Sequence, residues 1–358
     1  MKRVAAPQIC QIPRPSRQIP RPSRHYRALH ATTAPFTPLP RPSRQIPRPS
    51  RHYRALCVNP LKEHPTTPQH TTTHHDTPRH TKTMTKRILL VDLSYLVVQR
   101  FYATRAWERY NAKGKRLLEE TLERHYDTTF CDTLRRLCTL NEIRPENVLF
   151  AKDCRRSDIW RNAIFPQYKA SRGKSRLANE DEQAIDTTFE RTITRLIPSW
   201  GGGQRILQLD RAEADDIIAT FVRSPALSAW EKVVVSDDND MLQLCNASTR
   251  IIDAHNRRLE TRLGLFSPRE YLILKILRGD KSDNIPRVFK RCGPSKSEAL
   301  SRDPAMLSHA LLIDETGAKH RYALNDLLIN MDNIPALISN YVNDAVTDWI
   351  DLEKNDSH

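Results

Sequence analysis

The chain has 358 residues, which is long enough for one large or two moderate domains with buried cores. Its seven cysteines lack CxxC spacing, and no apolar run approaches the roughly 18 residues that span a bilayer, so we exclude a disulfide framework, a zinc site and a membrane protein. The net charge of +15 is uneven: residues 1–83 carry 15 Lys and Arg against two acids, which leaves only +2 for residues 84–358.

Residues 1–83 predict a disordered, basic tail rich in Pro, Arg and His. The segment Pro13–Leu29 recurs identically at Pro40–Leu56, and its prolines and like charges oppose helix, interior strand and compact packing. The composition resembles an organelle transit peptide, but the prolines oppose the amphipathic helix that such peptides form. We expect ordered structure from Met84 onward. Our hypothesis is that Met84 is the true start of the protein and that the tail is either an over-long gene assignment or a dispensable extension.

Beyond Met84, short apolar runs alternate with helical patterns. We predict strands at Arg87–Asp92, Asn147–Asp153, Arg205–Leu209 and Lys232–Asp237. Helices are predicted at Glu119–Leu140, Glu180–Ile197 and Glu213–Val222. This alternation predicts an α/β fold with a mostly parallel sheet covered on both faces.

Three of the four predicted strands end in aspartate. Asp92, Asp153 and the Asp237–Asp240 run each follow a buried strand, where a single Asp would ordinarily start a turn or cap a helix. Parallel strands deliver their carboxyl ends to one edge of the sheet, which is where ligands bind in such folds. We therefore expect these acids to lie together.

A helix start and a loop add further acids. In Glu213–Phe221 the apolar residues predict a stripe that packs on the sheet, while Glu213 and Asp216 share a neighbouring face and Asp215 projects from the first turn. The helix dipole accounts for one or two acids there, less readily for three. Asp280 and Asp283 follow in the loop Gly279–Asn284.

So many carboxylates repel one another unless cations lie among them, and no comparable set of Lys, Arg or His interleaves with them in the sequence. An all-oxygen site favours Mg²⁺ or Mn²⁺ over Zn²⁺. Two such ions about 4 Å apart would clamp the attacking and leaving oxygens of a phosphodiester, which makes phosphoryl hydrolysis the leading chemistry.

Seven motifs in this order resemble the flap endonuclease/5′-3′ exonuclease family, and within it most closely the ribonuclease H (5′-nuclease) of T-even bacteriophages. They are LLVDLSYLV (89–97), LFAKD (149–153), WRNAIFPQYKASRGKSR (160–176), EADDIIA (213–219), SDDNDMLQL (236–244), GDKSDNIP (279–286) and LLINMDNIP (327–335). The resemblance covers residues 86–346. It implies a PIN-like nuclease domain with a helical arch and a helix-three-turn-helix element.

Carried over by position, the resemblance implies two bound Mg²⁺ (or Mn²⁺) ions. Their ligands, direct or through water, would be Asp92, Asp153, Glu213, Asp215, Asp216, Asp238, Asp240, Asp280 and Asp283. Asp92, Asp153, Asp215 and Asp238 are our candidate catalytic acids. The S-x-D-x-D spacing of the family places its two aspartates at Asp238 and Asp240 of this chain. We therefore take Asp237 to be a bystander.

The arch segment, residues 160–178, would pass the 5′ strand. Its candidate nucleic-acid contacts are Arg161, Tyr168, Lys169, Arg172, Lys174 and Arg176, with Tyr168 able to stack on a base. Lys169 and Arg172 are our choices for the scissile region and the 5′ end, although a basic run by itself is usually a solvated helix face. We place the nuclease domain at 84–255 and a C-terminal helical DNA-binding region at 256–358.

The sequence departs from the family after GDKSDNIP. Relatives continue into a Gly-apolar-Gly hairpin, whereas here Arg291 stands where the first glycine would lie. Lys290, Arg291 and Lys296 keep the positive charge, so we expect them to contact duplex phosphates without reading sequence.

The resemblance implies a divalent-metal-dependent 5′-3′ exonuclease or flap endonuclease that removes RNA primers or 5′ flaps during replication. Expected substrates are branched or nicked DNA and RNA–DNA hybrids with a 5′ end, and expected partners are a single-strand-binding protein or clamp. We expect a monomer, in the host cytoplasm as a phage protein. The alternatives are a PIN-type ribonuclease on single-stranded RNA and a non-catalytic structure-specific binding protein; the basic tail could also be a nucleic-acid-binding arm.

Overall fold

The computed structural model describes residues 86–112, 118–171, 179–201 and 206–355; our predictions for residues 1–83, Arg172, Lys174 and Arg176 lie outside these ranges. The strands are β1 (Arg87–Asp92), β2 (Val148–Lys152), β3 (Ile206–Gln208), β4 (Glu231–Val235) and β5 (Thr249–Ile252). The helices are α1 (Leu93–Asn111), α2 (Glu119–Asn141), α3 (Arg161–Ile164), α4 (Asn179–Arg191), α5 (Ile197–Gly201), α6 (Ala214–Arg223), α7 (Pro268–Arg278), α8 (Pro294–Arg302), α9 (Pro304–Ile313), α10 (Ala318–Ile329) and α11 (Ala336–Asn355).

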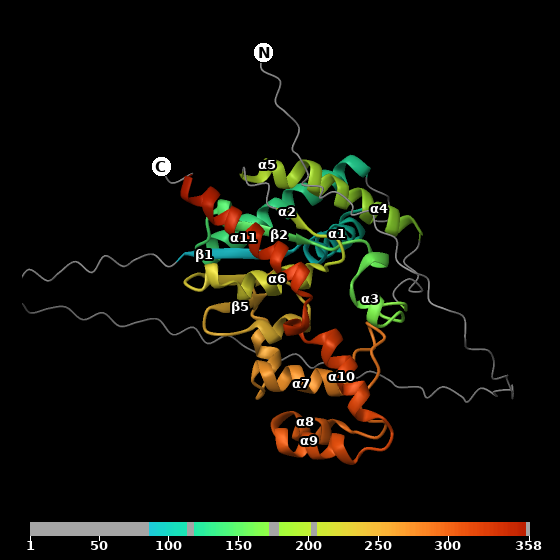
Figure 1. Ribbon diagram of the computed structural model, residues 1–358. Coiled ribbons are helices and arrows are strands. Elements are labelled where there is room, and N and C mark those ends of the chain that lie inside the picture. Colours follow the sequence, from blue (N-terminus) through green and yellow to red (C-terminus); the bar gives the residue numbers. More distant parts are fainter. Residues whose placement is uncertain (1–85, 113–117, 172–178, 202–205, 356–358) are drawn as a thin grey trace, which may run out of the picture. The chain divides into compact units, whose positions relative to one another are not determined.

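The five strands form one parallel sheet in the order β3-β2-β1-β4-β5 (Figure 1). On the central strand, Leu90 pairs with Leu149 of β2 and with Val234 of β4. The side chains of β1, β2 and β4 are almost entirely buried, as expected for parallel strands with both faces covered. The predicted α/β fold with a parallel sheet is confirmed.

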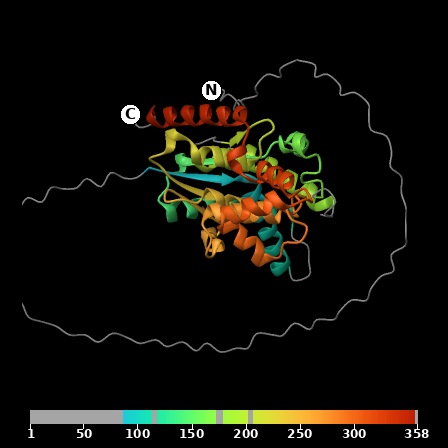
Figure 2. The same cartoon turned by 60° about the horizontal axis from the view of Figure 1, so that its bottom comes forward.

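Each face of the sheet has its own helical layer, because successive strand residues point to opposite faces. Leu89 and Val91 pack in a core with residues of α1, α2 and the π-helical turn Thr192–Leu196. Ile88 and Leu90 pack in a second core with α6 and α11, where the ring centroids of Trp230 and Trp349 are 5.1 Å apart and the rings are tilted by 58°. Figure 2 shows α11 lying along the outside of its layer.

The sequence located most of these elements but missed one strand. The four predicted strands correspond to β1–β4, whereas β5 was not predicted because its four residues lie between polar segments. The predicted stripe of α6 is buried as expected. The helix predicted over Glu180–Ile197 is broken into α4, the π-helical turn and α5.

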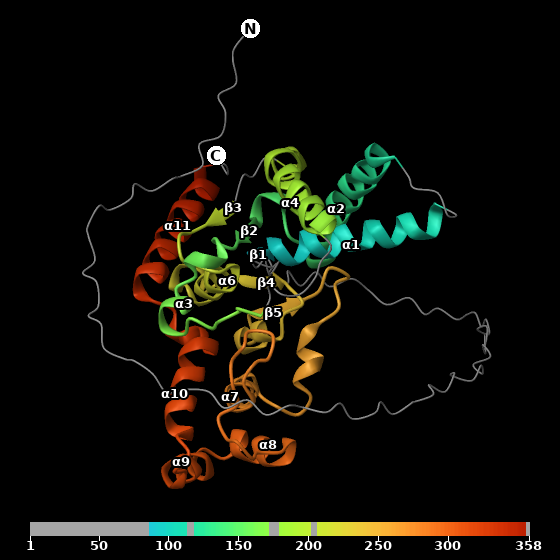
Figure 3. The same ribbon diagram turned by 90° about the vertical axis from the view of Figure 1, so that its right-hand side faces the viewer.

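The C-terminal helices α7, α8, α9 and α10 lie beyond the β5 end of the sheet (Figure 3). Helix α7 begins with a capping box, in which Ser267 and Glu270 bond each other's backbone N–H groups. The loop 279–293 then joins α7 to α8, and Val288 and Phe289 pack with Leu277 and Leu300 in a small core of their own. The GDKSDN motif lies in the loop of this helix–loop–helix unit.

Candidate active site

Asp92 occupies both the end of β1 and the start of α1. Its Oδ1 accepts a hydrogen bond from Tyr95 N at 3.0 Å, and its Oδ2 accepts from Ser236 Oγ at 3.1 Å. The residue therefore caps the helix and also faces the end of β4. Burial and the neighbouring carboxylate of Asp153 raise the pKa of Asp92 to about 7.

Asp153 follows β2 and joins three elements at the same edge of the sheet. Its Oδ2 accepts from Ser94 Oγ at 2.5 Å, in the first turn of α1. Its Oδ1 accepts from Ala214 N at 2.8 Å, at the first residue of α6. An N–H at a helix start favours a negative charge, so the fold holds this carboxylate in a fixed orientation.

Asp215 and Asp238 complete this set. Burial and the carboxylates of Asp238 and Asp92 raise the pKa of Asp215 well above its usual value. Asp238 is exposed and begins the 3₁₀ helix Asn239–Leu244 by accepting from Asp240 N at 2.8 Å. We call Asp92, Asp153, Asp215 and Asp238 the first acidic group, because their carboxylates act on one another electrostatically.

A second acidic group lies beside the C-terminal helices. Asp240, Asp280 and Asp283 each offer a carboxylate oxygen, and these oxygens lie within 4.8 Å of one another. Burial opposes ionisation of Asp280, but bonds from Ser282 and the charge of Lys275 lower its pKa below the usual value. Three such oxygens could hold a hard divalent ion.

The loop that carries Asp280 and Asp283 is closed and anchored. Asp280 and Ile285 exchange backbone hydrogen bonds of 3.0 and 2.7 Å across it. Asn325 of α10 is fully buried and donates to the carbonyls of Ile276 and Pro286 at 2.9 and 2.7 Å. Gly279 starts the loop with a φ of +64°, and a Cβ there would collide with the carbonyl oxygens of Ile285 and Pro286.

Gly279→Ala is therefore expected to lower the free energy of unfolding by about 3 kcal/mol, since both the backbone angle and the space reject a side chain. Gly264→Ala is the matched control, because Gly264 has a φ of +59° but nothing within 4 Å of the added Cβ. That variant should cost only about 1 kcal/mol. Denaturant unfolding of both measures the difference, and equal losses would contradict the close fit around Gly279.

Cations do interleave with these acids, contrary to our expectation from the sequence. Lys169 pairs with Glu213 and lies 3.8 Å from Asp283. Lys275 of α7 pairs with Asp240 and lies 3.2 Å from Asp280. The ion pairs of Lys169 and Lys275 could not be predicted from the sequence. Their partners are between 5 and 114 residues away along the chain and lie on different elements.

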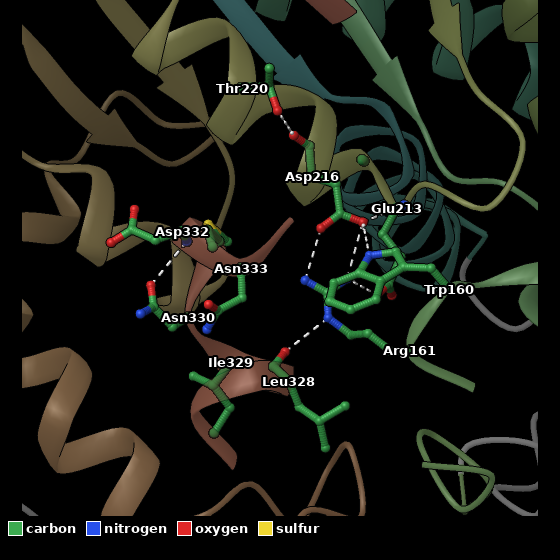
Figure 4. A network of polar contacts seen from close by, with 12 residues as sticks. Trp160, Arg161, Glu213, Asp216, Thr220, Leu328, Ile329, Asn330, Asp332 and Asn333 are labelled. Atoms are coloured by element: carbon green, nitrogen blue, oxygen red, sulfur yellow. Dashed lines mark hydrogen bonds and ion pairs between the residues drawn. The ribbon is translucent and has the colours of Figure 1, made fainter. Parts of the chain in front are cut away.

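Asp216, which we predicted as a metal ligand, points into the protein. It is fully buried and its two oxygens accept from both Nη atoms of Arg161 (3.0 and 2.8 Å), from Trp160 Nε1 (3.0 Å) and from Glu213 N (3.0 Å). Figure 4 shows this network from close by. The structure thus gives Asp216 a helix-capping and ion-pairing role in place of the predicted one.

Arg161 and Tyr168 also differ from the predicted nucleic-acid contacts, because both are buried. Arg161 donates to Glu213 Oε2 at 2.9 Å and to the carbonyl of Leu328 at 2.8 Å, which connects the arch segment to α6 and α10. The Tyr168 hydroxyl donates to Glu213 Oε2 at 3.1 Å. Neither side chain offers a free face to a base.

Lys169 is held by its backbone as well as by its ion pairs. Its φ is +53°, its N–H donates to the carbonyl of Asp283 at 3.0 Å, and Asn284 Nδ2 donates to the carbonyl of Gln167 at 3.0 Å. The arch segment and the GDKSDN loop are therefore clamped together. Lys290, Arg291 and Lys296 are exposed on the helix–loop–helix unit, so their predicted role stays open to test.

Sequence reasoning passed over three side chains of the site: Ser94, Ser236 and Lys275. The two serines donate to Asp153 and Asp92, and each stands within two residues of a predicted acid, which was the available signal. Asp237, which we predicted to be a bystander to metal binding, forms an ion pair with Arg262 at 2.5 Å.

The two acidic groups suit divalent cations. Each offers only carboxylate oxygens as ligands, and in the first group the pKa values of Asp92 and Asp215 are raised. Burial and the neighbouring carboxylates raise these values, and a hard cation among the oxygens would offset both effects. No helix in the described ranges is long and apolar enough to cross a membrane.

Residues 87–269 match the family model of the 5′-3′ exonuclease N-terminal resolvase-like domain. DNA polymerase I of Streptococcus pneumoniae (strain ATCC BAA-255 / R6) is 28% identical over 218 residues, which are 57% of this chain and 22% of that protein. The 5′-3′ exonuclease of Halalkalibacterium halodurans is 34% identical over 160 residues, 41% of this chain and 48% of that protein. The chain thus spans half or less of these curated relatives.

Two solved structures from bacteriophage T5 share the fold. The T5 D15 protein co-crystallised with metal ions has a TM-score of 0.55 and 15% identity, and the match covers 74% of this chain and 99% of that one. The T5 flap endonuclease in a pseudo-enzyme-product complex with DNA and metal ions has a TM-score of 0.54, 16% identity and the same coverage. These matches confirm the predicted nuclease-like fold.

Proposed function

Because this chain belongs to the 5′-3′ exonuclease family, we propose that it is a divalent-metal-dependent 5′-3′ exonuclease and flap endonuclease. The observation that carries the proposal is the convergence of Asp92, Asp153, Asp215 and Asp238 into one group, with the second acidic group beside it. These seven carboxylates suit phosphodiester hydrolysis, in which negative charge develops on oxygens held next to cations.

Two Mg²⁺ or Mn²⁺ ions would be held by the first and second acidic groups. When bound, such ions would act as Lewis acids that stabilise the negative charge developing on the phosphodiester oxygens. The chain's own residues do the rest: Ser94, Ser236 and the N–H of Ala214 orient the carboxylates. Lys169 lies 3.8 Å from Asp283 of the second group and its charge acts on Asp215 of the first, so it would pair with a phosphate oxygen of the substrate.

We propose branched or nicked DNA and RNA–DNA hybrids with a 5′ end as the substrates. The arch segment would receive the 5′ strand, with Lys169, Arg172, Lys174 and Arg176 as its contacts. The exposed Lys290, Arg291 and Lys296 would contact duplex phosphates. A T5 relative with this fold was solved with DNA and metal ions, which supports such a substrate. The use we propose is removal of primers or 5′ flaps in replication, by a monomer that works with a clamp or a single-strand-binding protein.

The test compares substrates and metals with one preparation of the full chain. A 5′-flap DNA labelled at its 5′ end is expected to be cut near the branch with Mg²⁺ or Mn²⁺ and to remain intact with chelator, because uncompensated carboxylates repel the phosphate. Product lengths on a denaturing gel measure this. Cleavage of single-stranded RNA with no cleavage of the flap would replace the proposal with a PIN-type ribonuclease, and no turnover on either would leave a binding protein.

A further inference from the structure

Two arginines on the far side of the sheet from the arch segment have no acidic partner among the residues that the structure describes. Figure 3 shows α1 and α2 on one side of the strands and α3 and α10 on the other. Arg100 of α1 is partly buried, yet its hydrogen-bond partners in the described ranges are neutral: Gln99 Oε1 accepts from Nε, and Thr133 Oγ1 accepts from Nη1 at 3.3 Å. Arg136 of α2 is exposed and donates from Nη2 to the carbonyl of Ala254 at 2.7 Å.

In the described part of the chain, no carboxylate lies within ion-pair distance of either guanidinium. Partial burial and the like charge of Arg136 lower the pKa of Arg100. Other partly buried arginines are neutralised: Arg191 pairs with Glu123 and Asp127, and Arg87 pairs with Glu142 and Glu231. Two like charges kept together in this way favour an anion from outside the chain.

His255 completes the cluster. Its Nε2 lies 3.4 Å from Gln99 Nε2, so Gln99 connects it to Arg100. Asp253, the nearest acid in sequence, is buried and already accepts from the N–H groups of His255 and Arg257 and from Arg257 Nε. The negative charge of Asp253 is therefore already balanced by Arg257 within the loop.

The loop that carries His255 is held firmly against α2. Asn141 Nδ2 donates to Asn256 Oδ1 at 2.9 Å, while Asn141 Oδ1 accepts from Arg250 Nη2 at 2.9 Å. The Ala254 N–H donates to the Tyr95 hydroxyl at 3.0 Å. The cluster is thus built from α1, α2 and the loop after β5, and its donors are pre-positioned.

We propose that Arg100, Arg136 and His255 form a subsite for a backbone phosphate of the nucleic-acid substrate. Arg136 Nε and Nη1 and Arg100 Nη2 have no hydrogen bond in the described ranges, which leaves planar donors for phosphate oxygens. This inference rests on the proposed nuclease function, because it assumes a polyanion at the neighbouring acidic edge.

The distance to the acidic edge fixes which phosphate the subsite holds. Helix α1 starts directly after Asp92, and Arg100 is eight residues further along it. At 1.5 Å per residue the separation along the helix axis is about 12 Å. That length corresponds to roughly three to four base pairs of B-form duplex. We therefore expect the subsite to hold a phosphate about two to four positions from the scissile one, depending on how the duplex axis runs relative to α1.

The test measures binding of a 5′-flap DNA to the full chain in chelator, where cleavage is prevented, over a series of salt concentrations. Arg136→Gln is expected to weaken binding about tenfold and to reduce the slope of log Kd against log salt by about 1. Arg135→Gln is the matched control, because Arg135 is next along α2, exposed and paired with Asp132 at 2.8 Å. It should change Kd less than about twofold.

A second measurement identifies the phosphate. Neutral methylphosphonates are placed one at a time in the duplex. At about two to four positions from the branch, they should weaken binding of the parent chain but not of Arg136→Gln. Arg100→Gln is expected to repeat this, and melting curves show whether either variant is folded. Two results together would overturn the subsite. Arg136→Gln and Arg135→Gln would bind the flap with the same Kd and salt dependence, and no methylphosphonate position would distinguish the parent chain from Arg136→Gln.

The outcome is separable from that of the proposed function. Cleavage of the flap by the parent chain with Mg²⁺, together with no effect of Arg136→Gln on binding, removes the subsite and leaves the nuclease. A position-specific phosphate effect without any cleavage keeps the subsite and removes the nuclease.

Discussion

Asp153→Asn is expected to reduce the single-turnover rate of flap cleavage by about a thousandfold or more while DNA binding in chelator persists. The substitution keeps the size of the side chain, and its amide oxygen can still accept from Ala214 N. It removes one of the negative charges of the first acidic group, and with it a candidate metal ligand. Quench-flow cleavage at saturating enzyme and varied Mg²⁺ measures the chemical step.

Asp237→Asn provides the matched control for this experiment. Asp237 lies beside the same edge of the sheet but is exposed and pairs with Arg262. We expect its rate to stay within about threefold of the parent, since a surface ion pair contributes little. Equal losses in the two variants would mean that general surface charge, and not a specific ligand, controls the reaction.

Arg161→Met is expected to lower the free energy of unfolding by about 3–5 kcal/mol. The change leaves Asp216 and one oxygen of Glu213 buried without their cation, and removing one partner of a buried ion pair costs far more than the pair itself contributes. It also frees the carbonyl of Leu328, so the contact between the arch segment and α10 weakens. Equilibrium denaturation measures the loss, with an intact α/β far-UV spectrum confirming the starting fold.

Two companion variants decide the cause of that loss. Arg135→Met removes an exposed pair and should cost less than about 1 kcal/mol. Adding Asp216→Leu to Arg161→Met should restore at least half of the stability, because the unpaired charge is gone. If the double variant is less stable than Arg161→Met alone, packing and not the stranded charge accounts for the effect.

The sequence predicted the central architecture because the determining signals are local. Unbroken apolar runs identified β1, β2 and β4, and the spacing of apolar residues identified α6 and its buried stripe. The acids at the strand ends could be placed at one edge because parallel strands share a direction. The family and fold follow from these same segments, and both are confirmed.

The sequence could not predict which acids face outward. Glu213 and Asp216 do share a face of α6, but that face meets Arg161, more than fifty residues away in sequence, and Asp216 turns inward to it. Lys275 was missed for the same reason, since only the packing of α7 brings it to Asp240. Ion pairs across elements depend on tertiary contacts that no local pattern encodes.

The clamp between Lys169 and the GDKSDN loop has a consequence for the cleavage position under the proposed function. A main-chain bond, Lys169 N to Asp283 O, and a side-chain bond, Asn284 Nδ2 to Gln167 O, set the offset between Lys169 and the second acidic group. Under the proposed function, this fixed offset would set the distance between the phosphate that Lys169 contacts and the position of the incision.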